Sequence, residues 1–200
     1  TMTPYVYRGG QDDYMIVDLE TWAVTFEGIV GSQEDANNKY NTNTVYKTSK
    51  LVLRKVEKGD YYIGGPETSA FSNSGAANSY HKVTIPADYY IGIYELTEAQ
   101  YGKIMSNSSY SSTLPVGNIS WNTIRGSAGV SSRPGTGCLK NLNDNTTVGG
   151  QKFITSSSAL AGFDLPTESM WEIAARAGIA TKWPTGDDSS DLDSYGWVRN

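Results

Sequence analysis

Four carboxylates near the end of the chain form its densest group of candidate metal ligands. Asp187, Asp188, Asp191 and Asp193 follow Gly186 closely. Carboxylate oxygens are the ligands that Ca²⁺ prefers, so these residues are a candidate calcium site. Their spacing is not that of an EF-hand loop, and a solvated turn is the alternative interpretation.

Nucleophilic chemistry has few candidate residues. The chain has one cysteine, Cys138, and one histidine, His81. A Ser-His-acid site would have to use His81, but no Gly-x-Ser-x-Gly motif supplies the nucleophile. The stretch Pro134-Gly-Thr-Gly-Cys138 lacks the Lys-Ser/Thr of a phosphate-binding loop. We expect Cys138 to be a semi-buried or exposed thiol in a loop, and His81 to be solvated or hydrogen-bonded.

The segment Leu165–Gly178 has the signals of a complete short helix. Thr167, after Pro166, is a suitable N-cap because its hydroxyl can accept a hydrogen bond from a free backbone N–H. Glu168 favours the positive end of the helix dipole. Gly178 can adopt the left-handed conformation that ends a helix.

The spacing within this helix predicts which side is buried. Residues at three- and four-residue intervals form the expected buried stripe: Met170, Trp171, Ala174 and Ala177. Glu172 and Arg176 are expected to pair across one turn on the exposed side.

The same segment, Leu165-Pro-Thr-Glu-Ser-Met-Trp-Glu-Ile-Ala-Ala-Arg-Ala-Gly178, resembles the signature of the formylglycine-generating enzyme family, also called the sulfatase-modifying-factor domain. Its signature residues here are Pro166, Thr167, Glu168, Trp171, Glu172 and Arg176. Three earlier blocks resemble the family in the same order: Gly59–Pro66, Val83–Tyr101 and Leu114–Trp121. The resemblance implies an α+β, C-type-lectin-related fold with short strands, few helices and long loops.

The resemblance also implies specific redox chemistry that this chain is poorly equipped for. Formylglycine formation resembles oxygen-dependent copper chemistry at two cysteine thiolates, and Cys138 does not match the family's cysteine positions. The iron site of the related sulfoxide-synthesising oxygenases needs three imidazoles, and only His81 is present. The family's later Gly-Asn-x-x-Glu-Trp and Arg-Gly-Gly motifs do not follow Trp197–Asn200. We therefore expect a domain that is incomplete at its C-terminus.

Patterning along the chain predicts the supporting elements. We expect strands at Asp13–Glu20 and Trp22–Glu27, a polar loop or linker at Gly31–Ser49, and a further strand at Lys50–Val56. This pattern divides the chain into N-terminal strands with a linker, residues 1–49, and a sulfatase-modifying-factor-like domain, residues 50–200. The first strands would be an extra element ahead of that domain.

Two further helices and a long irregular region complete the expected elements. Thr97 is expected to cap a helix at Glu98–Met105, and Ser120 one at Trp121–Ile124. Residues Arg125–Gly162 are rich in Gly, Ser, Asn and Thr, which indicates irregular surface loops.

Composition narrows the classes of partner. The net charge of −5, with no basic cluster, argues against nucleic-acid binding. No apolar run approaches the ~20 residues of a membrane-spanning helix. The Asn/Ser/Thr-rich composition favours an extracellular protein, and no signal peptide is visible in the sequence given. Acceptor sequons for N-glycosylation start at Asn107, Asn118 and Asn145.

These observations predict a non-catalytic extracellular or cell-surface module that acts through binding or assembly. Its partners would be a glycan, a protein ligand or further copies of itself, and calcium is the candidate cofactor. A glycosylated, self-associating structural protein is a variant of this hypothesis. The alternative is an oxidoreductase of the formylglycine-generating type whose cysteine-bearing half is not part of this chain.

Overall fold

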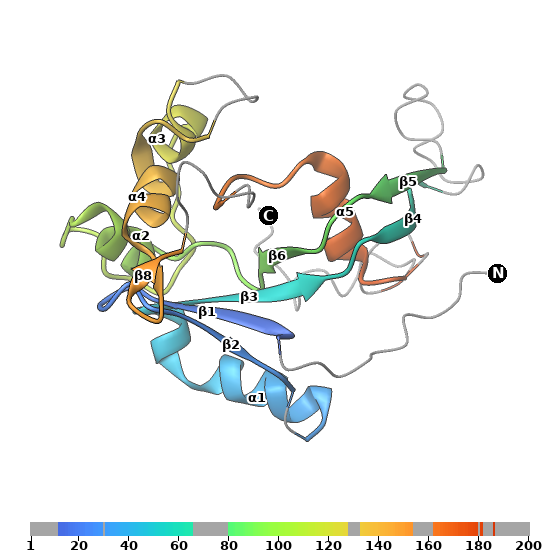
Figure 1. Cartoon of the computed structure of the whole chain (residues 1–200), viewed down its shortest axis with the longest axis horizontal. Coiled ribbons are helices and arrows are strands. Elements are labelled where there is room, and N and C mark those ends of the chain that lie inside the picture. Colours follow the sequence, from blue (N-terminus) through green and yellow to red (C-terminus); the bar gives the residue numbers. More distant parts are fainter. Residues whose placement is uncertain are drawn as a thin grey trace. The chain divides into compact units, whose positions relative to one another are not determined.

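The computed structural model describes residues 12–29, 31–65, 80–127, 133–153, 162–179, 181 and 186. The chain divides into two compact units. One contains Val56–Tyr89 and the chain from Pro166 onward, and the other contains Gly9–Lys55 and Tyr90–Leu165. The order of the helices and strands can be followed by colour in Figure 1. The described residues form short strands and few helices, which confirms the α+β class.

A four-stranded sheet in the order β2-β1-β3-β6 is the largest sheet among the described residues. Its strands are β1 (Tyr14–Asp18), β2 (Val24–Glu27), β3 (Lys50–Val56) and β6 (Tyr89–Gly92). β1 is antiparallel to both β2 and β3, and Val17 lies opposite Val24 on one side and Leu51 on the other. The predicted strands are confirmed, and β1 is an inner strand of this sheet, between β2 and β3. The expected division into residues 1–49 and 50–200 stays a prediction.

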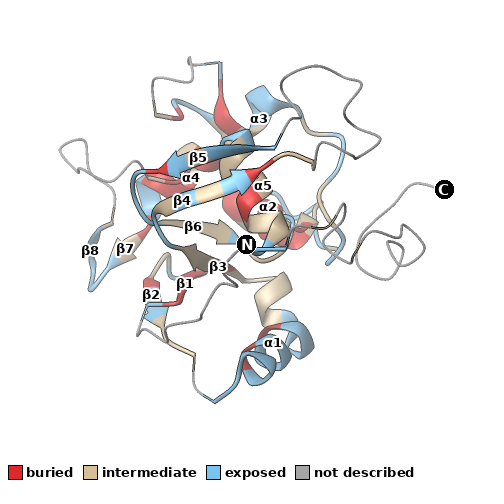
Figure 2. Ribbon diagram, turned by 90° about the vertical axis from the view of Figure 1, so that its right-hand side faces the viewer, coloured by how far each residue is buried: buried red, intermediate tan, exposed pale blue. Residues whose placement is uncertain are grey.

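The two faces of β1 lie in separate apolar cores because side chains alternate along a strand. Met15 and Val17 face a core completed by helices α2 (Glu98–Met105) and α4 (Gly137–Asn145). Tyr14 and Ile16 face a smaller core on the opposite side. The buried residues of β1 are red in Figure 2, whereas α1 (Gln33–Thr42) is largely exposed and pale blue.

The polar linker expected at Gly31–Ser49 is wrong, because helix α1 and the 3-10 helix η1 (Thr44–Lys47) occupy most of it. Ser32 and Asp35 form a reciprocal capping box that stabilises the start of α1. Tyr40 anchors the helix to the sheet, with its ring centroid 4.7 Å from that of Tyr14. Two buried side chains, Ala36 and Tyr40, are sufficient to hold a helix whose other residues are polar.

Helix α2 confirms both its predicted limits and its predicted cap. The Thr97 hydroxyl accepts a hydrogen bond from Gln100 N at 3.2 Å, and the Gln100 side chain accepts one from Thr97 N at 3.0 Å. The buried Gln100 amide also donates to the carbonyl oxygens of Tyr46 and Lys50. A single residue therefore caps the helix and attaches it to the start of β3.

The region expected to be irregular contains regular structure. Helix α3 (Trp121–Arg125) ends just inside it, and α4 follows. A two-stranded sheet then pairs β7 (Thr147–Val148) with β8 (Gln151–Lys152). The expectation of surface loops is therefore wrong for the helix, which buries Leu139 and Leu142 in the larger core.

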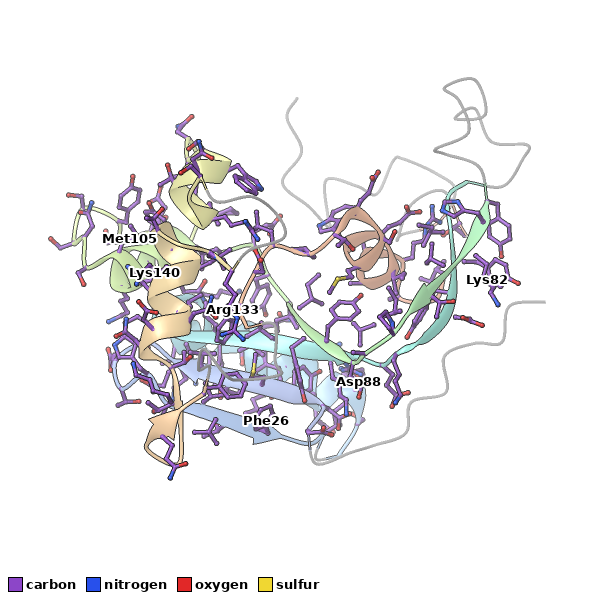
Figure 3. All side chains as sticks on the ribbon, turned by 45° about the horizontal axis from the view of Figure 1, so that its top comes forward. Phe26, Lys82, Asp88, Met105, Arg133 and Lys140 are labelled. Atoms are coloured by element: carbon purple, nitrogen blue, oxygen red, sulfur yellow. The ribbon has the colours of Figure 1, made fainter. Side chains whose placement is uncertain are left out.

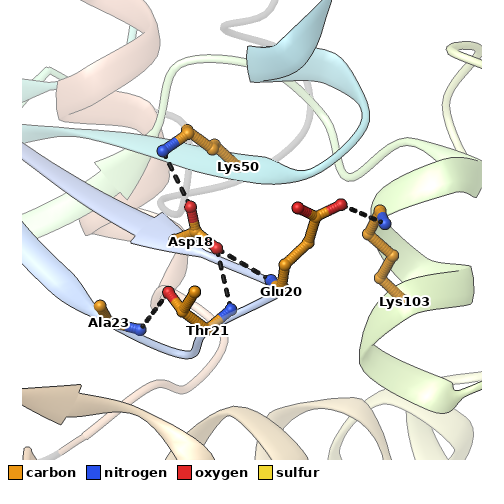
Figure 4. Close-up of polar contacts among 6 residues, drawn as sticks. All are labelled: Asp18, Glu20, Thr21, Ala23, Lys50 and Lys103. Atoms are coloured by element: carbon orange, nitrogen blue, oxygen red, sulfur yellow. Dashed lines mark hydrogen bonds and ion pairs between the residues drawn. The ribbon is translucent and has the colours of Figure 1, made fainter. Parts of the chain in front are cut away.

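Asp18 organises the turn between β1 and β2. Its carboxylate accepts hydrogen bonds from Glu20 N at 3.0 Å and Thr21 N at 2.9 Å, and it pairs with Lys50 on β3 at 2.9 Å (Figure 4). Although burial acts to raise the pKa of Asp18, the bonds from Lys50 and the turn amides lower it well below its ordinary value. The turn is therefore fixed by a charged acceptor.

The other unit contains a hairpin and one helix. β4 (Gly59–Ile63) pairs antiparallel with β5 (His81–Ile85), and α5 (Glu168–Arg176) contacts β4. Ile63, Ile85 and Ile173 form its buried core. None of the described helices is long and apolar enough to cross a membrane.

Candidate functional site

Helix α5 carries the predicted signature and is built as expected at both ends. The Thr167 hydroxyl accepts a hydrogen bond from Met170 N at 3.2 Å, which confirms the N-cap. Left-handed backbone begins at Ala177, with a φ of 47°, and continues at Gly178, with a φ of 83°. The helix therefore ends at Arg176, and Gly178 adopts the left-handed backbone expected of it. Pro166, Thr167 and Glu168 lie exposed at its entrance.

The buried side of α5 differs from the prediction. Ile173 is buried against the hairpin, whereas the Trp171 side chain is 60% exposed and Ala177 is also exposed. Residues two apart in a helix point in nearly opposite directions, so burial of Ile173 directs Trp171 away from the core. Met170, which lies one turn before Ile173 on the same side of the helix, is half-buried, as is Ala174. The predicted burial of Trp171 is wrong because the stripe is centred on Ile173.

Glu172 connects the helix to the hairpin. Its carboxylate oxygen Oε1 accepts a hydrogen bond from Gly64 N at 2.8 Å and one from Arg176 Nε at 2.6 Å. The Glu172–Arg176 pair is confirmed, but its side chains are only 24% and 19% exposed, respectively. The pair therefore lies on the packed side of the helix and not on the expected exposed side.

A second polar contact joins α5 to the chain after the hairpin. The Tyr89 hydroxyl donates to the Met170 carbonyl oxygen at 2.7 Å, and burial raises the pKa of Tyr89 to about 12. Tyr89 therefore remains a neutral donor at physiological pH. Two hydrogen bonds therefore hold the helix, one between Glu172 and Gly64, which follows β4, and one between Met170 and Tyr89, which follows β5 in the sequence.

The single cysteine is not in the environment of a reactive thiol. Cys138 lies in helix α4 and is 1% exposed, so its expected place in a loop is wrong. Burial raises the pKa of its thiol to about 12. Reactive or metal-binding cysteines need the thiolate form, which a lowered pKa and access to solvent provide. His81 is exposed at the first position of β5, in agreement with a solvated position.

The acidic candidates Asp187, Asp188, Asp191 and Asp193 lie outside the described residues, so the calcium site stays a prediction. Elsewhere in the part of the chain that the structure describes, no three His, Cys, Asp or Glu side chains gather to hold a metal.

All three sequon asparagines are exposed. Asn107 Oδ1 accepts a hydrogen bond from Ser109 N at 3.1 Å. Asn118 has left-handed backbone with a φ of 56°. Asn145 is held by its own helix, because its side-chain amide donates to Asn141 O at 2.8 Å.

Two buried polar contacts were not predicted from the sequence. The Arg125 guanidinium makes a two-point ion pair with Asp164, with Nε–Oδ1 and Nη2–Oδ2 distances of 2.6 and 2.9 Å. The Asn143 side chain both donates to Phe163 O at 2.9 Å and accepts from Phe163 N at 2.7 Å. Both contacts hold the chain just before the signature helix, and the two residues of each contact are 20 or more positions apart in the sequence, so no local pattern indicated them.

Comparison with protein families supports the resemblance. The family model described as "Sulfatase-modifying factor enzyme 1-like domain" matches residues 36–199. This range includes the signature helix, the hairpin and two strands of the four-stranded sheet, β3 and β6, whereas β1 and β2 precede it. Searches of curated proteins and of solved structures produced no match.

Proposed function

Because the chain belongs to the sulfatase-modifying factor enzyme 1-like family, we propose that these 200 residues form a binding or assembly module on that scaffold. The observation that carries the proposal is the state of Cys138. It is the chain's single thiol, it is buried in α4, and its pKa is raised. Thiolate-dependent copper oxidation needs an accessible, ionised sulfur, so this residue is unsuited to that role.

Exposed aromatic side chains support a role in binding. Large rings with polar edges are enriched at interfaces, where they contribute much of the binding energy. The described residues expose several: Tyr62, Tyr80, Trp121 and Trp171. We further propose that the scaffold is C-type-lectin-related, which makes a glycan or a protein surface a suitable ligand.

The catalytic part of the proposal can be tested directly. The purified chain, supplied with copper and oxygen, should form no aldehyde on a Cys-x-Pro-x-Arg peptide. Aldehyde formation that disappears in Cys138→Ala would overturn the proposal and favour the formylglycine-generating oxidoreductase as the alternative. The binding part is tested on an immobilised glycan array and by light scattering. A chain that binds no glycan and remains monomeric at all concentrations would contradict a binding or assembly role.

We also propose an extracellular or cell-surface location. The exposure of Asn107, Asn118 and Asn145 supports it, because an acceptor asparagine must be reachable by a glycosyltransferase. The test is the intact mass of the protein from its natural source, before and after treatment with a glycosidase. An unchanged mass equal to that of the bare polypeptide would argue against glycosylation at these positions.

A further inference from the structure

One face of the β4–β5 hairpin is directed away from helix α5. The register places Asp60 opposite Thr84 and Tyr62 opposite Lys82. Because side chains alternate along strands, these four residues share the face opposite to Ile63 and Ile85, which pack against the helix. Figure 3 labels Lys82 on the side of the hairpin that is away from α5. We call these four residues, together with Tyr80, the hairpin face.

The centre of the hairpin face is a stacked pair of tyrosines. The ring centroids of Tyr62 and Tyr80 are 5.1 Å apart, and the ring planes are inclined by 11°. Cross-strand aromatic pairs stabilise a hairpin. Stacking nevertheless leaves Tyr62 47% and Tyr80 43% exposed. The pair is therefore a rigid aromatic platform that still exposes a large area to solvent.

Opposite charges lie beside this platform. Asp60 Oδ2 pairs with Lys82 Nζ at 2.8 Å, and Asp60 Oδ1 accepts a hydrogen bond from the Thr84 hydroxyl at 2.6 Å. Both charged side chains are about half exposed. The face therefore presents one acidic and one basic group, fixed by the register of a single hairpin.

A surface with this composition is complementary to itself. In a two-fold symmetric dimer, contacts are reciprocal: if residue i of one copy contacts residue j of the other, residue j of the first contacts residue i of the second. An axis near the Asp60–Lys82 pair brings each carboxylate towards the partner copy's ammonium group, while the tyrosine platforms cover one another. A partner of uniform charge would instead meet a like charge on this face. The mixed charge of this face therefore fits a second copy of this chain better than a partner of uniform charge.

We propose that the hairpin face is a two-fold interface between two copies of this chain. The proposal rests on the assembly role stated above and names the partner and the surface for it. Asp60 and Lys82 set the orientation of the two copies, and the tyrosine platform supplies the apolar area.

Complementary charge reversal tests the interface. In Asp60→Lys, two lysines face each other twice across the axis, and in Lys82→Asp, two aspartates do so. Each variant alone should dimerise at least about tenfold more weakly than the wild type by sedimentation equilibrium. An equimolar mixture of the two variants should recover dimers, because each interface pair is then again of opposite charge.

Control experiments distinguish pairing between two copies from an ion pair that acts only within one hairpin. If Asp60 and Lys82 act only within one copy, mixing the variants restores nothing, and that result overturns the proposal. Asp144→Lys reverses one charge of the exposed Lys140–Asp144 pair on α4 and should leave dimerisation unchanged. Should the reversed variants fail to fold by circular dichroism, Tyr62→Thr, which removes the ring but keeps a residue that favours strands, should weaken dimerisation by a similar factor.

The outcomes also distinguish this proposal from the proposed function. A wild-type chain that is monomeric at every concentration overturns the interface, while a glycan-binding, non-catalytic module would remain supported by the array. Dimers that neither charge variant weakens would place the interface elsewhere and also overturn the proposal.

Discussion

Replacing Glu172 by alanine tests whether the signature helix is held by its acidic residue. The substitution removes the carboxylate that accepts hydrogen bonds from Gly64 N at 2.8 Å and Arg176 Nε at 2.6 Å. The Gly64 amide then loses its acceptor on α5. Arg176 keeps its bond from Nη1 to Thr181 O at 3.2 Å but loses its ion-pair partner.

The expected cost follows from the number of bonds and their exposure. A hydrogen bond to a charged group contributes about 1.5–3 kcal/mol. The Glu172 side chain is 24% exposed, so water can compensate part of the loss. We expect Glu172→Ala to lower the free energy of unfolding by about 2 kcal/mol. Glu172→Gln, which keeps an acceptor oxygen but not the charge, should lower it by about 1 kcal/mol.

Hydrogen exchange and urea denaturation together measure this effect. Exchange at the Gly64 amide should accelerate in Glu172→Ala by at least about tenfold, because its acceptor is gone. The matched control is Asp144→Ala, which removes a more exposed pair with the same spacing, and it should cost about 0.5 kcal/mol or less. If both alanine variants lose the same small amount of stability and Gly64 exchange is unchanged, the reasoning is refuted.

Four further substitutions separate the effect of burial from the sequence pattern. In thermal unfolding, Ile173→Ala should lower the free energy of unfolding by about 2–5 kcal/mol and Trp171→Ala by about 1 kcal/mol. The reverse order would show that Trp171, and not Ile173, is the buried residue. Gly102→Ala should destabilise by about 1–3 kcal/mol, although alanine favours helices, because the added Cβ would meet the Tyr110 carbonyl oxygen at 2.5 Å; a stabilised variant would show that the backbone shifts freely. The Cys138 thiol has a pKa raised from 9.0 to about 12, so in that window the unfolded chain binds fewer protons and stability falls as pH rises. Cys138→Ala should lack this component of the alkaline stability loss, and identical pH profiles would contradict the burial of the thiol.

Local signals in the sequence were sufficient for the elements that depend on neighbouring residues. Thr97 and Thr167 cap their helices as predicted, because a cap joins a side chain to a backbone N–H only three residues away. The alternating strand at Lys50–Val56 was predicted with its observed limits. The family was also readable from the sequence, since ordered blocks identify it without any three-dimensional contact.

Local sequence patterns did not predict the elements whose packing partner is distant in the sequence. Helix α1 looked like a polar linker, because its anchor Tyr40 contributes only when Tyr14 and Tyr46 lie beside it. Pairing of β1 with β3 across more than 30 residues decided that β1 is an inner strand. No local pattern specifies such pairings, because they depend on which surfaces meet after the chain has folded.

The sequence by itself determined the family, the capped helices, the alternating strands and the supply of one thiol and one imidazole. Tertiary structure alone decided that Cys138 is buried and protonated, that Trp171 faces solvent, and that Glu172 holds the helix to Gly64. The physical reason is the same in each case. Helix caps and the alternation of side chains along a strand depend on residues close together in the sequence, whereas burial and pKa depend on atoms that only folding brings near.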